Sequence, residues 1–333
     1  MIITYFRSSS YNTFSICQQQ YFLNYCLGIP QVTGQKAEMG TIVHKVMECL
    51  AKAKESVQNG QKTIDDEHFG SMTIPKDLFD QHFVEYLLQL SFEHYSDPNR
   101  TAHTYDHTHF QFCKKSVHKV LNEEWFDPRK RDVIGVEPFF NIPIEEDWAH
   151  YDYDGVQGQL HIMGTIDLIT RAKQNVGEVI DWKTGQCKDW ATDTPKDFKK
   201  LCGDPQLRIY HLALAKLYPE IEHWAMSIHF INAGGAFTLS YGQDDIRKTL
   251  DMLRKRFTQI QKTTRPVLKS NTNKHWFCKY VCDYGKCVHP QDVEGRTICR
   301  FIKDELVSKG MDAVVDKYTH GNFDVNFYQN PGA

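Results

Sequence analysis

Two apolar segments that each run up to an aspartate constrain this chain more than any other feature. In QLHIMGTIDLI, residues 159–169, apolar side chains alternate up to Asp167, and VGEVIDW, residues 176–182, ends on Asp181-Trp182 and is followed by Lys183. Alternation with a period of two is typical of a half-buried β-strand. Two such strands side by side in one sheet would bring both carboxylates and the lysine ammonium to one place.

Helical periodicity surrounds these strands and predicts an α/β fold. Helices are predicted at residues 40–57, 77–95, about 111–125, 203–217 and 243–262, and strands at 133–144, 159–169, 176–182, 223–231 and 235–241. The polar stretch 58–75 is interpreted as a surface loop or insertion, and the final seventy residues as irregular. Helices alternating with strands in this order predict a layered α/β core, in one elaborated domain or two.

Composition and charge narrow the function classes. The chain has 39 Lys+Arg against 42 Asp+Glu, a net charge of −3, so a nucleic-acid site would have to be a local basic patch. No apolar run reaches the 18 or so residues of a membrane helix, and no basic region followed by an apolar core marks a secretory signal. We therefore expect a cytoplasmic protein. Its ten cysteines then point to thiols, metal binding or catalysis rather than disulfides.

The paired carboxylates have the chemistry of a divalent-cation site. Mg²⁺ and Mn²⁺ prefer oxygen ligands, and a lysine beside such an ion can orient water or neutralise charge on a phosphate. Asp-x-Lys alone is expected about once by chance in a chain of this length. Its order along the chain makes it informative, because Gly40-Thr41-Ile42-Val43-His44 precedes it and Gln206 and Tyr210 follow at i, i+4 on one face of a predicted helix.

This ordered set resembles the RecB-like branch of the PD-(D/E)XK nuclease superfamily. The resemblance implies a restriction-endonuclease-like core, a central mixed sheet flanked by helices. It also implies that His44, Asp167, Asp181 and the Trp182 carbonyl bind Mg²⁺ or Mn²⁺. Lys183 would then be the catalytic lysine, acting with Asp167 and Asp181. Gln206 and Tyr210 would support the site and contact DNA.

The cysteines extend the resemblance to the iron–sulfur members of that branch, which include CRISPR-associated RecB-type nucleases and AddAB-type nuclease domains. By resemblance, Cys17, Cys278, Cys282 and Cys287 would hold a 4Fe–4S cluster, although the usual C-x₂-C-x₅-C spacing is x₃ and x₄ here. Four thiolates can also bind structural Zn²⁺, which remains the alternative. Cys26 and Cys299 are left over, and Cys299 is the preferred substitute ligand.

The resemblance also implies how one nuclease domain, residues 1–333, is organised. A cluster subdomain would combine residues 1–30 and 265–300, a helical insertion would span 55–130, and the catalytic core would span 131–262. Candidate phosphate-binding runs are Arg129-Lys130-Arg131, Lys196 with Lys199-Lys200, and Arg254-Lys255-Arg256. Tyr5, Phe6, Trp276 and Phe277 could stack unpaired bases or pack around the cluster.

The expected function is that of a metal-dependent DNA exonuclease acting on single-stranded ends. The resemblance favours the 5′ end and a role in DNA repair, recombination or end processing. Two alternatives stay open: a DNA-end-binding subunit of a recombination or CRISPR-integration complex, and a structure-specific endonuclease. No G-x-x-x-x-G-K-[ST] phosphate loop is present, so a helicase partner would have to supply any ATP-driven unwinding.

Overall fold

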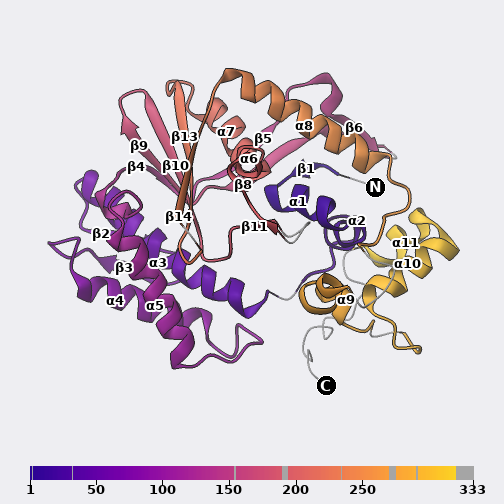
Figure 1. Ribbon diagram of the computed structural model, residues 1–333, viewed down its shortest axis with the longest axis horizontal. Helices are drawn as coiled ribbons and strands as arrows, with labels where there is room; N and C mark the ends of the chain where they lie inside the picture. The colour runs from indigo at the N-terminus through magenta and orange to yellow at the C-terminus, as the bar shows by residue number, and fades with distance from the viewer. Residues whose placement is uncertain are drawn as a thin grey trace.

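Two neighbouring β-sheets form the centre of the molecule (Figure 1). The computed structural model describes residues 1, 3–31, 33–153, 155–189, 194–233, 235–269, 275–289 and 292–319. The first sheet has the order β14-β13-β10-β9-β4, with strands β4 (Asp132–Val136), β9 (Leu168–Lys173), β10 (Val176–Lys183), β13 (His223–Phe230) and β14 (Gly235–Tyr241). The second has the order β1-β8-β5, with strands β1 (Tyr5–Phe6), β5 (Phe139–Pro143) and β8 (His161–Thr165). Strand β10 is parallel to β13 and antiparallel to β9, so the first sheet is mixed.

A bent two-stranded ribbon joins the two sheets. The stretches predicted as single strands, 133–144 and 159–169, are each divided in two, because β4 continues into β5 and β8 into β9 across a bend. Pro138, which has no backbone N–H, lies at the bend of the first strand. The ribbon stays paired there, since Ile166 N donates to the Pro138 carbonyl over 3.3 Å. Asp167 lies at the bend of the second strand.

Helices cover both faces of the five-stranded sheet. On one face α3 (Gln35–Gln58), α4 (Gln81–Tyr95) and α5 (His107–Asn122) form a core with Ile180 and Trp182 of β10. On the other face α7 (Pro205–Leu217) and α8 (Gln243–Gln261) pack with Val179 of the same strand. Figure 1 shows the first group below the sheets and the second above them. Successive side chains of β10 thus point into opposite cores. The predicted α/β architecture, with helices flanking a mixed sheet, is confirmed.

Two stretches differ from the sequence prediction. Residues 58–75, predicted as a loop, contain the hairpin β2 (Thr63–Asp66) and β3 (Gly70–Thr73), because Ile64, Met72 and Ile74 are buried in the α3 core. A second hairpin pairs β6 (His150–Tyr153) with β7 (Val156–Gln159), in a stretch for which no element was predicted. The shorter elements that precede β13 along the chain are η2 (Pro128–Lys130), η3 (Asp147–Ala149), β11 (Lys188–Asp189), β12 (Thr194–Pro195) and α6 (Phe198–Cys202).

The last part of the chain is helical rather than irregular. It contains η4 (Phe277–Val281), α9 (Asp283–Lys286), α10 (Ile298–Lys309) and α11 (Met311–Tyr318). Ile298, Ile302 and Leu306 form an apolar stripe at i, i+4 spacing along α10. The predicted irregular residues 320–333 lie outside the described part of the chain.

The C-terminal helices pack against the beginning of the chain. Phe22, Leu23 and Leu27 share a buried cluster with residues of η4 and α10. They lie in or directly after η1 (Phe22–Cys26), which follows α1 (Ser8–Ile16) and α2 (Gln18–Tyr21). Figure 1 accordingly shows α2 beside α9 and α10. Among the residues that the structure describes, no helix is long and apolar enough to cross a membrane.

Candidate active site

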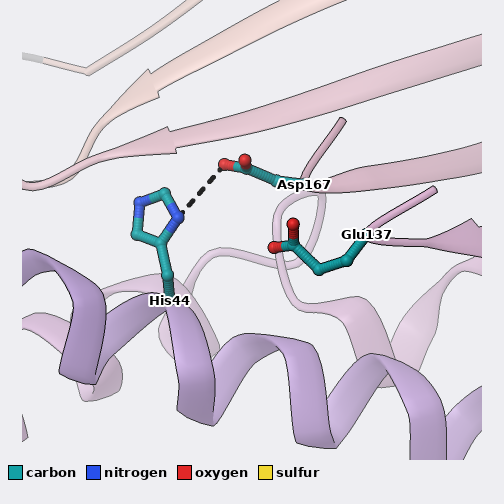
Figure 2. A group of neighbouring side chains, drawn as sticks. All are labelled: His44, Glu137 and Asp167. Carbon is teal, nitrogen blue, oxygen red and sulfur yellow. Dashed lines mark ion pairs between the residues drawn. The ribbon is translucent and has the colours of Figure 1, made fainter. Parts of the chain in front are cut away.

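Helix α3 brings His44 to the bend of the ribbon. Gly40 permits the approach, because a Cβ atom built at this position would lie only 2.8 Å from Thr184 Oγ1, just beyond the end of β10. One turn later, His44 Nδ1 lies 3.4 Å from Asp167 Oδ2 (Figure 2). The predicted Gly40-x-x-x-His44 spacing therefore has a packing reason: the glycine admits the sheet and the histidine then faces it.

Asp167 is fixed from a second side by the neighbouring strand. Its Oδ2 atom accepts a hydrogen bond of 3.0 Å from the backbone N–H of Trp182. The Trp182 side chain is buried in the α3 core, so this stretch of β10 backbone is held in place. The structure thus places Asp167 against both His44 and the Trp182 backbone N–H.

Glu137 is a site residue that the sequence analysis missed. His44, Glu137 and Asp167 each offer one ligand atom, and these atoms all lie within 4.8 Å of one another. Figure 2 shows both carboxylates directed toward the imidazole on α3. Burial, and then the Asp167 charge, raise the pKa of Glu137 to about 8. The available signal was an acidic residue within an otherwise apolar strand pattern, directly before a proline.

The backbone at Glu137 is itself unusual. With φ of 48°, Glu137 is the one non-glycine residue in the described chain that has a positive φ. The left-handed region costs an L-residue roughly 1–2 kcal/mol, and such outliers concentrate at functional sites. The bend of the ribbon imposes this conformation and directs the side chain toward α3.

Asp181, which is fully buried, and Lys183, which is half-buried, form an ion pair on the other side of the same edge. Lys183 Nζ lies 2.9 Å from Asp181 Oδ1 and 2.7 Å from Oδ2. Burial raises the pKa of the fully buried Asp181 to about 6, opposed by the Lys183 ammonium and assisted by the Asp167 carboxylate. Burial disfavours the charge on Lys183, but Asp181 and Asp167 outweigh it and raise the pKa of this lysine. The site therefore concentrates negative charge around one ammonium group.

Helix α7 supplies the hydrogen-bonding support expected for this carboxylate. Gln206 Nε2 donates to Asp181 Oδ1 over 2.7 Å and to the Tyr210 hydroxyl over 2.8 Å. The Tyr210 hydroxyl in turn donates to the Thr165 carbonyl over 2.7 Å. These bonds link Asp181 of β10 through α7 to Thr165 of β8, two residues before Asp167. Gln206 and Tyr210 are thus brought to the site, where they hold Asp181 in one orientation.

The donor set fits a hard divalent cation. Carboxylate oxygens and an imidazole nitrogen are ligands that Mg²⁺ and Mn²⁺ accept. Asp181 Oδ2 is buried and, apart from its ion pair with Lys183, has no hydrogen-bond donor in the described structure. The Lys183 ammonium already balances the charge on this oxygen, so the case for a cation rests on the His44, Glu137 and Asp167 ligand atoms. His44, Glu137 and Asp167 would hold the cation, with Asp181 beside them.

Three of the cations in two predicted phosphate-binding runs already have acidic partners in the structure. Arg129 is buried against Asp127, at 2.8 Å, and Arg131 binds the buried Glu178 at 2.6 Å. Lys196 pairs with Asp204 at 2.6 Å. On α8, Arg256 lies over the Tyr11 ring and donates to Ser15, while Arg254 and Lys255 are exposed. The first run therefore has a structural role.

Cysteines gather where the two ends of the chain meet. Cys17, Cys278, Cys282 and Cys299 line one pocket, and Cys287 is not among its lining residues. Burial, then the neighbouring Cys17, raise the pKa of Cys299, and Cys282 and Cys278 add to that rise. Burial raises the pKa of Cys287 as well, but the charged groups that shift it are Asp283 and Lys286 and not the other cysteines. The structure brings three of the four predicted cluster ligands together, with Cys299 as the fourth sulfur.

Comparison with known proteins provides one strong match. A family model described as the PD-(D/E)XK nuclease superfamily matches residues 8–287, which is most of the chain. A solved structure from Eubacterium rectale, provisionally described as an exonuclease, is similar over 80% of this chain and 84% of its own, with 11% sequence identity and a TM-score of 0.45. No curated protein matches the chain.

Proposed function

This chain belongs to the PD-(D/E)XK nuclease superfamily, and from that premise we propose that it is a DNA exonuclease whose catalytic site lies at the bend of the ribbon. The family membership makes the protein a nuclease, a hydrolase of phosphodiester bonds that uses a divalent metal. The observation that carries the site assignment is the meeting of the His44–Asp167 pair with the Asp181–Lys183 pair at one edge of the sheet.

Each residue has a role that follows from its contacts. His44, Glu137, Asp167 and Asp181 supply the ligands, with the Trp182 carbonyl as the further ligand expected from the resemblance. A divalent cation bound there would polarise the scissile phosphate and lower the pKa of water. Lys183 is held against Asp181 and remains about one-third exposed, so its ammonium can reach an attacking water or the phosphate. Gln206 and Tyr210 are positioning residues that orient Asp181.

The choice of substrate rests on the resemblance to the RecB-like branch. We place the protein among exonucleases that act on single-stranded DNA ends, with the 5′ end favoured, in repair, recombination or end processing. A helicase or recombination partner would supply unwinding. A charged, metal-binding set of this kind supports catalysis over simple binding of DNA ends, because a subunit that only binds DNA has no need for Asp181 and Lys183.

The cysteine pocket is proposed to hold a 4Fe–4S cluster that clamps the two ends of the chain. The four sulfurs that line it come from Cys17, Cys278, Cys282 and Cys299, so we propose Cys299 in place of Cys287. A tetrahedral zinc with bonds of about 2.3 Å would hold its thiolates roughly 3.8 Å apart. Within the described residues, no three cysteine sulfurs lie within 4.8 Å of one another. The preference for the cluster over a single Zn²⁺ therefore rests on the resemblance.

The experiment that tests the proposed function is a time course on end-labelled DNA. Linear and circular single strands are incubated with the purified protein and Mg²⁺ or Mn²⁺. An exonuclease degrades the linear strand and leaves the circle intact, and labels at the two ends reveal the polarity. Cleavage of the circle would establish an endonuclease, and binding without cleavage of either would establish an end-binding subunit.

A further inference from the structure

A row of side chains on the β1-β8-β5 sheet leads up to the bend that holds Glu137 and Asp167. Side chains of a strand alternate between its two faces, so Phe139 and Asn141 of β5 share one face. Thr165 of β8 lies on the same face, because it pairs with Phe139, and His161 follows further along β8. Glu137 and Asp167 come directly after these strands, where the Glu137 amide binds the Asp167 carbonyl.

The opposite face of this small sheet is closed. Phe140 packs edge-on against Tyr210 of α7 at a centroid distance of 6.0 Å, and Ile162 is almost completely buried. Phe6 on β1 is fully buried on the same side. The β1-β8-β5 sheet is therefore covered by helices on one face, and on the other face Phe139, Asn141 and Thr165 are exposed.

The open face has the character of a nucleic-acid platform. Phe139 is 58% exposed although it is a large aromatic residue in the middle of the fold, next to the site. Further from the site, Arg7 lies over the Tyr5 ring at 5.6 Å. Apart from Glu137 and Asp167 at the bend, the outward positions of these three fully described strands and Arg7 carry no acidic side chain. Between Phe139 and Arg7 on this face, the side chains of Asn141 and His161 form an exposed hydrogen bond, with 2.6 Å between Asn141 Oδ1 and His161 Nδ1.

We propose that this face binds the single-stranded DNA that enters the active site, and that Phe139 stacks on the base next to the scissile phosphate. The inference rests on the proposed nuclease function and deepens it. At about 3.3 Å per residue, the six residues from Asp167 to His161 cover roughly 20 Å, enough for a few nucleotides. Aromatic side chains on open sheets stack on unpaired bases, whereas the base faces in a duplex are already covered by their neighbours.

Binding of a short, fluorescently labelled single strand in EDTA tests the proposal without catalysis. Phe139→Ala should weaken binding by about 10-fold, the order expected for the loss of one base–aromatic stack, and Phe139→Tyr should retain it. Arg7→Gln should lower the slope of log Kd against log salt by about one. Tyr86→Ala is the matched control, since Tyr86 is a similarly exposed aromatic residue, at 50%, on α4. Its affinity should equal that of the wild type.

A second measurement separates this inference from the proposed function. Hydrolysis of bis(4-nitrophenyl) phosphate with Mn²⁺ by the wild-type protein needs the metal site but no base stacking, so it reports on the nuclease site separately from the platform. If wild-type protein hydrolyses the small diester and Phe139→Ala binds DNA like Tyr86→Ala, the platform is wrong while the nuclease assignment stands. If the wild type hydrolyses neither the small diester nor DNA, the proposed function itself has failed.

Discussion

The backbone N–H of Glu137 donates a hydrogen bond of 3.2 Å to the carbonyl oxygen of Asp167. This bond continues the strand ladder through the bend of the ribbon and places the two acidic residues in facing positions. Both side chains then extend toward His44 on α3 (Figure 2). The bend that joins the two sheets is therefore also the structure that assembles the ligand set.

Replacement of Glu137 by Gln should weaken metal binding. The variant keeps the shape of the side chain but loses one of the negative charges that attract the cation, so the Kd for Mn²⁺ should rise by about 10-fold or more. Calorimetric titration of metal-stripped protein measures this change. Glu124→Gln, at an exposed position in the turn before η2, is the control. Equal Kd values for the two variants would remove Glu137 from the site.

The pH dependence of stability should also report on Glu137. Its pKa of about 8 in the folded protein exceeds the ordinary value of 4.5, so between these pH values the folded chain holds a proton that the unfolded chain has lost. Metal-free wild-type protein therefore loses stability as the pH rises from about 5 to 8. Glu137→Gln lacks this proton, so the Tm difference, variant minus wild type, should increase over the same range in EDTA. Parallel Tm curves would contradict the raised pKa.

Tyr210→Phe should separate the positioning of Asp181 from general stability. The hydroxyl bonds the Thr165 carbonyl and Gln206, so its loss should cost about 1 kcal/mol in urea unfolding and slow cleavage several-fold. Tyr241→Phe is a matched control, because its hydroxyl donates to the Cys202 carbonyl over 3.0 Å on the edge strand β14. It should lose similar stability and keep full activity. Equal activity losses in the two variants would deny Tyr210 a specific role.

Cysteine substitutions should identify the ligands of the pocket. With a 4Fe–4S cluster on Cys17, Cys278, Cys282 and Cys299, anaerobically purified protein should be yellow-brown and contain about four irons per chain. Cys299→Ala should lose the colour and the iron, and Cys287→Ala should keep both. The opposite result would restore the ligand set implied by the sequence spacing. About one zinc per chain and no visible absorbance would establish the zinc alternative.

The sequence singles out five of the residues that the structure gathers at the candidate site. Asp167, Asp181 and Lys183 stand out because they follow apolar strand patterns, and Gln206 and Tyr210 because they are one helical turn apart. Glu137 was missed because residues 133–144 were interpreted as one continuous strand, in which a single acidic residue before a proline is a weak signal. The bend and the positive φ of Glu137 appear only in the folded ribbon.

The remaining errors came from partners that are distant in the sequence. Arg131 belongs to a predicted phosphate-binding run, but its partner Glu178 is on β10 and only the folded sheet brings them together. The β2–β3 hairpin was predicted as a loop, since its few buried residues acquire an apolar environment only against α3. The fourth sulfur of the cysteine pocket stays a prediction: Cys287 has the expected total spacing from Cys278, but Cys299 is the residue that lines the pocket.

The most direct test of the proposed nuclease site is metal-dependent cleavage by wild-type protein and by two variants of the Asp181–Lys183 pair. Wild-type protein should degrade labelled single-stranded DNA with Mg²⁺ or Mn²⁺ and stop when EDTA is added. Asp181→Asn and Lys183→Ala should each reduce the single-turnover rate by about 100-fold or more, and Lys183→Ala should still bind Mn²⁺. Wild-type rates in both folded variants would contradict the assignment of this site.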